Sequence, residues 1–280
     1  MSYSISSNKF SHPLLKPILL ELSDYFKEFE IFFFVIGATA RDIIMKIHNE
    51  KSGRLTEDLD IAITINDWNQ YKKVEEGILN LKNFTKDPNQ KQRFIYLNKF
   101  PLDIVPFGEI MNQENKIFWP ADEIIAMSVL GFNAAQKASL KVVIDEEIEI
   151  KIASLSGIFL LKIAAWSERH QKTNKDADDI GFILNNYLEI NRERSIKYYE
   201  EIYIEDFSIV TSGATLLGMD LNEILQDFKD AKNKIVEILV KELEKQEDSM
   251  LINQILETHK ALKYEEIYKS IESIINQLNK

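Results

Sequence analysis

The first half of the chain mixes helical and strand-like hydrophobic patterns. Some segments place apolar side chains at helical spacing, whereas others are short and apolar or alternate with a period of two, as strands do. These patterns predict helices over residues 14–29, 39–48 and 67–81, and strands over residues 31–36, 58–65, 93–97, 101–107, 140–144 and 148–152. Because only residues 98–100 separate two of these strands, we expect 93–97 and 101–107 to form an antiparallel hairpin.

The second half shows only helical periodicity. It predicts helices over residues 156–170, 175–190, 222–243 and 264–278, and the segment 241–249, rich in Glu, Lys and Gln, indicates a solvated helix. The change of pattern near Ser156 predicts two domains, residues 1–155 and residues 156–280. The expected fold class is therefore α+β, with a mixed sheet and flanking helices followed by an all-helical half.

The amino-acid composition limits the kinds of metal site and of nucleic-acid binding that the chain can have. The chain has 280 residues, 45% of them hydrophobic, which is enough to bury a full core. It has no cysteine and four scattered histidines, so thiolate and zinc sites are disfavoured and an enzyme would use oxygen ligands. A net charge of −11 argues against sequence-independent nucleic-acid binding over the whole surface, while a local basic patch or a basic partner stays compatible with it.

No segment of the sequence has the pattern of a targeting or membrane signal. The N-terminus lacks a basic region followed by an apolar one, and the longest apolar run, residues 31–40, is far shorter than the roughly 20 residues that a bilayer requires. We therefore expect a cytoplasmic protein with no membrane partner.

Acidic residues lie on two of the predicted strands. Asp58 and Asp60 are two residues apart and are expected to project from one face of a strand, and Asp103 lies on another strand. Two carboxylates this close stay ionised only beside a cation. A hard divalent ion, Mg²⁺ or Mn²⁺, held by the three acids would suit phosphoryl or nucleotidyl transfer from a nucleoside triphosphate. The spacing alone fits solvated surface acids equally well.

Candidate phosphate-binding residues flank these acids. Residues 37–39, Gly37, Ala38 and Thr39, join a predicted strand to a predicted helix, where small side chains let backbone N–H groups approach a phosphate. A simple turn is the plain alternative. Arg54 precedes the acid pair, and it either neutralises triphosphate oxygens or pairs with Glu57.

A second cluster lies in the helical half. Lys162, Trp166 and Arg169 share one face of an otherwise apolar helix, so Lys162 either extends its ammonium to solvent or serves a ligand. The next helix opens with Asp176 and Asp179, which either favour the helix dipole or belong to a site.

Taken together, these residues resemble the AbiEii family of nucleotidyltransferase toxins, which belongs to the DNA polymerase β-like nucleotidyltransferase superfamily. The family shows a strand ending in Gly-Gly or Gly-Ser, then Arg-x-Thr-x-Asp-hydrophobic-Asp, then a third strand acid. This chain has Gly37-Ala38, then RLTEDLD over residues 54–60, then Asp103. The family's helical lysine, arginine and K/R-D-x-x-D run are similar to Lys162, Arg169 and residues 175–179 here.

The resemblance implies a polymerase β-like fold whose helical domain completes the active-site cleft. It implies transfer of a nucleoside monophosphate from a nucleoside triphosphate to a tRNA or protein acceptor, with release of pyrophosphate. It also implies a role as the toxin of a type IV toxin–antitoxin or abortive-infection system, with a cognate antitoxin as partner.

The resemblance further implies roles for individual residues. Asp58, Asp60 and Asp103 would hold the metal, and Lys162 and Arg169 would contact phosphates. Asp176 would be either a general base or an orienting partner for one of those cations. Ala38 departs from the family pattern, so a hydroxyl for the triphosphate would come from Thr39 or be replaced by backbone N–H groups.

Two other functions fit the same residues. A transferase that modifies a small-molecule antibiotic would use the same acids and differ only in its acceptor pocket. A degenerate fold that only binds nucleotide is the non-enzymatic alternative, favoured by Ala38 and the acidic charge and opposed by the presence of all three acids.

Overall fold

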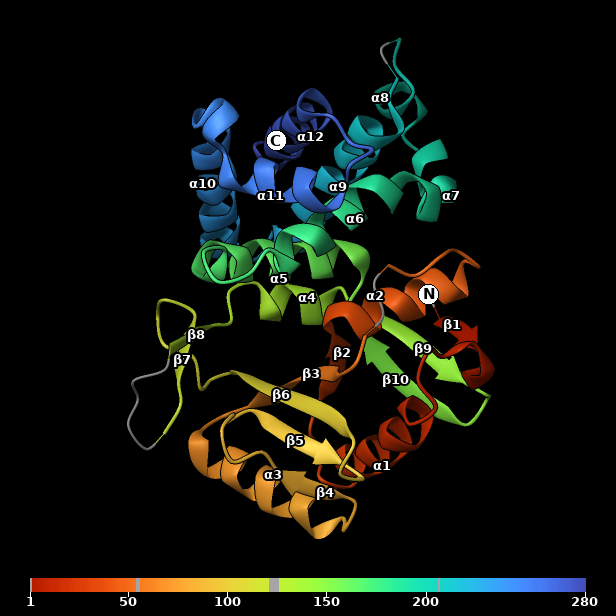
Figure 1. The fold of residues 1–280 in the computed structure, drawn as a ribbon, viewed down its shortest axis with the longest axis vertical. Helices are drawn as coiled ribbons and strands as arrows, with labels where there is room; N and C mark the ends of the chain where they lie inside the picture. Colours follow the sequence, from red (N-terminus) through yellow and green to blue (C-terminus); the bar gives the residue numbers. More distant parts are fainter. Residues whose placement is uncertain (1, 54–55, 121–125, 206) are drawn as a thin grey trace. The chain divides into compact units, whose positions relative to one another are not determined.

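The computed structural model divides into two compact units, Met1–Ser154 and Leu155–Lys280 (Figure 1). It describes residues 2–53, 56–120, 126–205 and 207–280. Within these ranges no helix is both long enough and apolar enough to span a bilayer. The first unit contains the sheet, and the second is helical, as the change of hydrophobic pattern near residue 155 predicts.

Unit 1 is built on a mixed sheet with the strand order β1-β9-β10-β2-β3-β6-β5-β4. At its centre β3 runs parallel to β6 and antiparallel to β2, and the predicted hairpin is present as β5 and β6. The strands are β1 (Ser2–Ile5), β2 (Phe33–Ile36), β3 (Leu59–Ile65), β4 (Phe84–Lys86), β5 (Arg93–Tyr96), β6 (Phe100–Gly108), β9 (Leu140–Ile144) and β10 (Ile148–Ile152), with a separate pair β7 (Lys116–Phe118) and β8 (Ala126–Ser128).

Helices cover both faces of this sheet. They are α1 (Leu15–Glu28), α2 (Gly37–Ile47), α3 (Trp68–Asn80) and α4 (Phe132–Lys137), with a short 3₁₀ turn η1 (Ser7–Lys9). Helix α1 buries its apolar face against the side of the sheet that carries Phe33, whose ring centroid lies 4.9 Å from that of Phe26. Helix α4 packs on the opposite face, where Gln136 Nε2 donates to Thr64 Oγ1 at 3.0 Å. Thr64 and Asp60 lie on the same face of β3, because strand side chains alternate.

Unit 2 consists of α5 (Leu155–Arg169), α6 (Lys175–Ile190), α7 (Arg192–Ile196), α8 (Tyr199–Ile202), α9 (Ile209–Leu225), α10 (Lys229–Glu244), η2 (Gln246–Asp248), α11 (Met250–Thr258) and α12 (Tyr264–Leu278). Helix α9 lies at its centre and packs against α5, α6 and α12 (Figure 1). Helix α5 is apolar on nearly all sides and almost entirely buried, which makes Lys162 an exception within it.

Two helix predictions in this half are wrong in detail. The helix predicted over 222–243 is broken, because α9 ends at Leu225 and α10 begins at Lys229. Leu225, Phe228 and Ala231 keep a spacing of three residues across the break, so the hydrophobic period conceals it. The segment 241–249 is also not one solvated helix. Glu242 is buried and accepts hydrogen bonds from Ser249 Oγ and the Leu251 amide, which ties the start of α11 to α10.

Candidate active site

The central strands of unit 1 place the acids of the sequence motif together. Asp60 on β3 and Asp103 on β6 are register partners on adjacent parallel strands, so their side chains leave the same face of the sheet. Asp58 lies in the bend immediately before β3 and not in the strand itself. Asp103 is the more enclosed, with 14% of its side chain exposed against 40% for Asp58.

A fourth residue, Arg93, binds these acids. It lies on β5 directly opposite Asp103, and its guanidinium donates through Nε to Oδ1 at 2.7 Å and through Nη2 to Oδ2 at 2.8 Å. The same Nη2 lies 3.6 Å from Asp58 Oδ2. The pKa of Arg93 is raised by its hydrogen bonds with Asp103 and by the charges of Asp103, Asp58 and Asp60. Among the described residues, this one guanidinium therefore interacts electrostatically with all three acids.

The acids fit a hard divalent cation by their donor chemistry, since carboxylate oxygens are the ligands that Mg²⁺ and Mn²⁺ prefer. Within the described ranges, however, no three Asp, Glu or His side chains converge closely enough to hold a metal ion as they stand. Both oxygens of Asp103 accept hydrogen bonds from Arg93. In this structure Asp103 is therefore paired with Arg93.

The strand-to-helix turn leaves room for the carboxylate of Asp60. Gly37, the first residue of α2, has φ +65°, and a Cβ atom there would lie 2.4 Å from Asp60 Oδ2. Both the backbone conformation and the close carboxylate require glycine. Ala38 is buried behind it, and Thr39 Oγ1 donates to the backbone carbonyl of Asp58 at 3.0 Å. The turn thus contacts the acid pair at both of its members.

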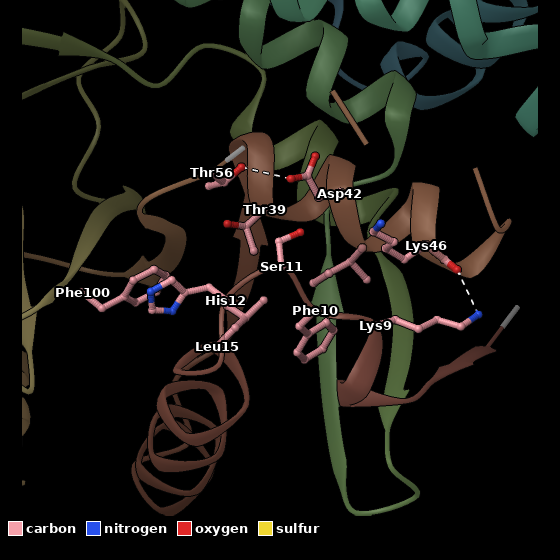
Figure 2. A pocket seen from close by; sticks show the side chains of 11 residues that line it. Lys9, Phe10, Ser11, His12, Leu15, Thr39, Asp42, Lys46, Thr56 and Phe100 are labelled. Carbon is pink, nitrogen blue, oxygen red and sulfur yellow. Dashed lines mark hydrogen bonds between the residues drawn. The ribbon is translucent and has the colours of Figure 1, made fainter. Parts of the chain in front are cut away.

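A buried polar network supports the same turn from α2. Arg41 is 1% exposed and donates through Nε and Nη2 to Asp42 Oδ1, at 3.1 and 2.9 Å. Asp42 Oδ2 accepts from Thr56 Oγ1 at 3.1 Å, as Figure 2 shows. Thr56 is the threonine of the Arg-x-Thr-x-Asp motif. It connects the segment that leads into Asp58 to helix α2.

A pocket adjoins this network. Thr39, Asp42 and Thr56 line one part of it, and the ring of His12, stacked 4.3 Å from that of Phe100, lines another (Figure 2). Phe100 begins β6, three residues before Asp103, but strand alternation places the two side chains on opposite faces of the sheet. The Phe100 side of the pocket therefore lies on the other face of the sheet from Asp103. The remaining motif residue, Arg54, lies outside the described residues.

Unit 2 brings together the helical residues of the motif. Asp176, at the start of α6, is fully buried and accepts hydrogen bonds from Arg169 Nε at 2.6 Å, Arg169 Nη2 at 2.7 Å and Lys162 Nζ at 3.1 Å. Lys162 Nζ also lies 2.7 Å from Asp179 Oδ2. Only 13% of the Lys162 side chain is exposed, whereas 52% of the Arg169 side chain is. Arg169 presents the accessible positive charge of this cluster.

Burial and charge act in opposite directions on these groups. Burial alone would raise the pKa of Asp176, but the hydrogen bonds from Arg169 and the charge of Lys162 hold that pKa below its ordinary value. Burial alone would lower the pKa of Lys162, but the charges of Asp179 and Asp176 raise it. The net shifts therefore favour the charged form of both Asp176 and Lys162.

Arg93 was not identified as a site residue from the sequence. The residue opposite Asp103 follows from the register of the hairpin, which the sequence pattern does not fix. A loop of residues 98–100 would have placed Ile95 opposite Asp103. The observed pairing of Tyr96 with Phe100 places Arg93 there instead.

Comparison with known proteins points to one family. The model of the family described as nucleotidyl transferase AbiEii toxin, type IV toxin–antitoxin system, matches residues 21–248. No curated protein matches the sequence. Among solved structures, an antigenic nucleotidyltransferase-like protein from Paracoccidioides brasiliensis is 15% identical, with a TM-score of 0.42, over 70% of this chain and 90% of that one. The antibiotic-resistance factor ANT(2'')-Ia is 14% identical, with a TM-score of 0.39, over 67% and 95%.

Proposed function

Because the chain belongs to the AbiEii family of nucleotidyltransferase toxins, we propose that this nucleotidyltransferase moves a nucleoside monophosphate onto a tRNA or protein acceptor by a metal-dependent reaction. Asp58, Asp60 and Asp103 hold the divalent cation in this proposal. The observation that carries it is the register pairing of Asp60 with Asp103, next to Asp58, around a shared positive charge.

The bound cation, Mg²⁺ or Mn²⁺, would neutralise triphosphate oxygens and favour an ionised acceptor hydroxyl. The chain's own residues prepare that site. Gly37 leaves room for the carboxylate of Asp60 beside the start of α2, and Thr39 Oγ1 donates to the backbone carbonyl of Asp58. The backbone N–H groups at the start of α2 have no earlier helical partner, so they suit the phosphates of the nucleotide.

Arg169 and Lys162 have different roles in the helical cluster. Arg169 is half exposed and fits direct contact with the triphosphate, whereas Lys162 is enclosed with Asp176 and Asp179. Asp176 is a poor general base, because its pKa is low and both of its oxygens accept hydrogen bonds from cations. Its contacts favour the orienting role. It holds the Arg169 guanidinium in one position.

The family supplies the biological setting. A type IV toxin–antitoxin family implies a cognate antitoxin, so the proposed role of this enzyme is that of a toxin whose transfer reaction arrests growth. The acceptor is the finer part of the proposal. The two candidates, tRNA and protein, both offer a hydroxyl group as nucleophile.

The test is label transfer from each α-³²P nucleoside triphosphate in turn, with Mg²⁺ and, as acceptor, total bacterial tRNA, a tRNA-free lysate or an aminoglycoside. Asp60→Asn, which removes one charge with little change in shape, is the inactive control, and Asp24→Asn, on the exposed side of α1, is the matched active one. Label on tRNA or on a protein, absent with Asp60→Asn, supports the proposal and names the acceptor. Label on an aminoglycoside alone would instead identify an antibiotic-modifying enzyme, and binding without transfer to any acceptor would indicate a nucleotide-binding module.

A further inference from the structure

The relation between Arg93 and the acids has a direct consequence for metal binding. Arg93 is held in place by hairpin register, with its guanidinium paired to both oxygens of Asp103 and 3.6 Å from Asp58. Its side chain is 21% exposed, so solvent screens this contact only in part. The positive charge of Arg93 therefore already lies beside the carboxylates that would bind the proposed divalent cation.

We infer that Arg93 is an internal counter-cation that competes with the divalent metal ion for Asp103. This inference rests on the proposed metal-dependent function. Without metal, the guanidinium offsets the mutual repulsion of the three carboxylates and keeps them together. When a divalent ion arrives, it meets both the repulsion of Arg93 and a carboxylate whose two oxygens already accept hydrogen bonds.

Because of this competition, the site is expected to bind the metal ion together with the nucleotide in preference to the metal ion alone. A triphosphate carries several negative charges and offsets the positive charge of Arg93, whereas a free metal ion brings no such compensation. The wild-type site consequently binds the metal ion weakly by itself and more tightly together with the nucleotide. Arg93 is a positioning residue in this account, because it acts through the acids.

The test measures Mn²⁺ affinity directly, by electron paramagnetic resonance of the free ion, without nucleotide and without turnover. Wild type is compared with Arg93→Gln, Arg93→Lys and Asp60→Asn. Lys99→Gln is the matched control, because it removes one positive charge from the exposed turn of the same hairpin. Circular dichroism and thermal unfolding in EDTA establish that each variant is folded.

Arg93→Gln is expected to bind Mn²⁺ about tenfold more tightly than wild type, from the repulsion between a single and a double positive charge some 5 Å apart in a largely aqueous setting. Lys99→Gln is expected to match wild type. Arg93→Lys keeps the charge but loses the two-pronged contact, so it is expected to gain roughly two- to threefold. It also provides a measurement if Arg93→Gln does not fold.

Two outcomes overturn the inference, and they are distinguishable. If wild type binds Mn²⁺ in an Asp60-dependent manner but the Arg93 variants bind it no more tightly, Arg93 only holds the acids in place and the metal site itself stands. If neither wild type nor Arg93→Gln binds Mn²⁺ more tightly than Asp60→Asn does, both this inference and the proposed metal site are wrong.

Discussion

Gly37 and Asp60 are in such close contact that a Cβ atom on Gly37 would lie 2.4 Å from Asp60 Oδ2. This contact joins two parts of the motif that are separated by more than twenty residues of sequence. It places the carboxylate of Asp60 against the first turn of α2, whose backbone N–H groups have no partner earlier in the helix.

Gly37→Ala is expected to destabilise unit 1 by about 1–3 kcal/mol, because alanine is strained at φ +65° and its methyl group meets the carboxylate. Urea unfolding measures this cost. A double-mutant cycle with Asp60→Ala separates the two causes, since the methyl contact is relieved in that background and the backbone strain is not. An equal cost in both backgrounds would show that the contact with Asp60 contributes nothing.

Asp176→Asn is expected to flatten the acid limb of the stability curve. The pKa of Asp176 is lower in the folded chain than its ordinary value of 3.8, so its stabilising contribution is complete above that value and is lost as the pH falls through the lower, folded pKa. Unfolding free energies between about pH 5 and pH 2 test this linkage. Asp230→Asn, an exposed acid in the first turn of α10, is the control and should leave the slope unchanged.

Arg169→Gln is expected to lower kcat/KM for the triphosphate by about tenfold or more, equivalent to one charge-assisted hydrogen bond of roughly 1.5–3 kcal/mol. Steady-state kinetics with the preferred nucleotide measures the loss. Arg192→Gln is the matched control, because that arginine is similarly exposed and pairs only with Glu189 among the contacts of the described chain. An unchanged kcat/KM for Arg169→Gln would assign Arg169 a purely structural role.

Expression of the protein is expected to slow bacterial growth, and Asp58→Ala or Asp60→Ala is expected to abolish the effect. Growth curves after induction, with protein levels matched by immunoblot, provide the measurement. Asp24→Ala, on the exposed side of α1, should remain as toxic as wild type. Full toxicity in both active-site variants would show that growth arrest does not require these acids.

Local periodicity was sufficient to predict most elements of unit 1. The alternation of Leu59, Ile61 and Ile63 predicts β3, and the aromatic run before Gly37 predicts β2. The short strand β1 was not predicted, because residues 2–5 are mostly polar and gain their strand only by pairing with β9. Such pairing between distant segments leaves no local pattern.

The sequence was sufficient to predict the motif residues of the site but not the residue that pairs with them. The sequence pointed to Asp60 and Asp103, but their counter-charge depends on a turn in which Leu97 and Asn98 both adopt positive φ. Leucine rarely does so, and no local pattern indicates it. A hairpin with a different loop would pair another residue with Asp103. The contact between Arg93 and Asp103 therefore depends on the strand register, which the residue types alone do not predict.

The central claim is that the three acids support a metal-dependent nucleotidyl transfer, and pyrophosphate release tests it whichever molecule is the acceptor. Wild type, Asp60→Asn and Asp24→Asn are incubated with all four nucleoside triphosphates and a bacterial lysate, with Mg²⁺ or with EDTA, and the pyrophosphate released by the lysate alone is subtracted. The account predicts release by wild type and Asp24→Asn only with Mg²⁺, and a loss on the order of 100-fold or more in Asp60→Asn. Equal release by Asp60→Asn, or release by wild type that persists in EDTA, would contradict it.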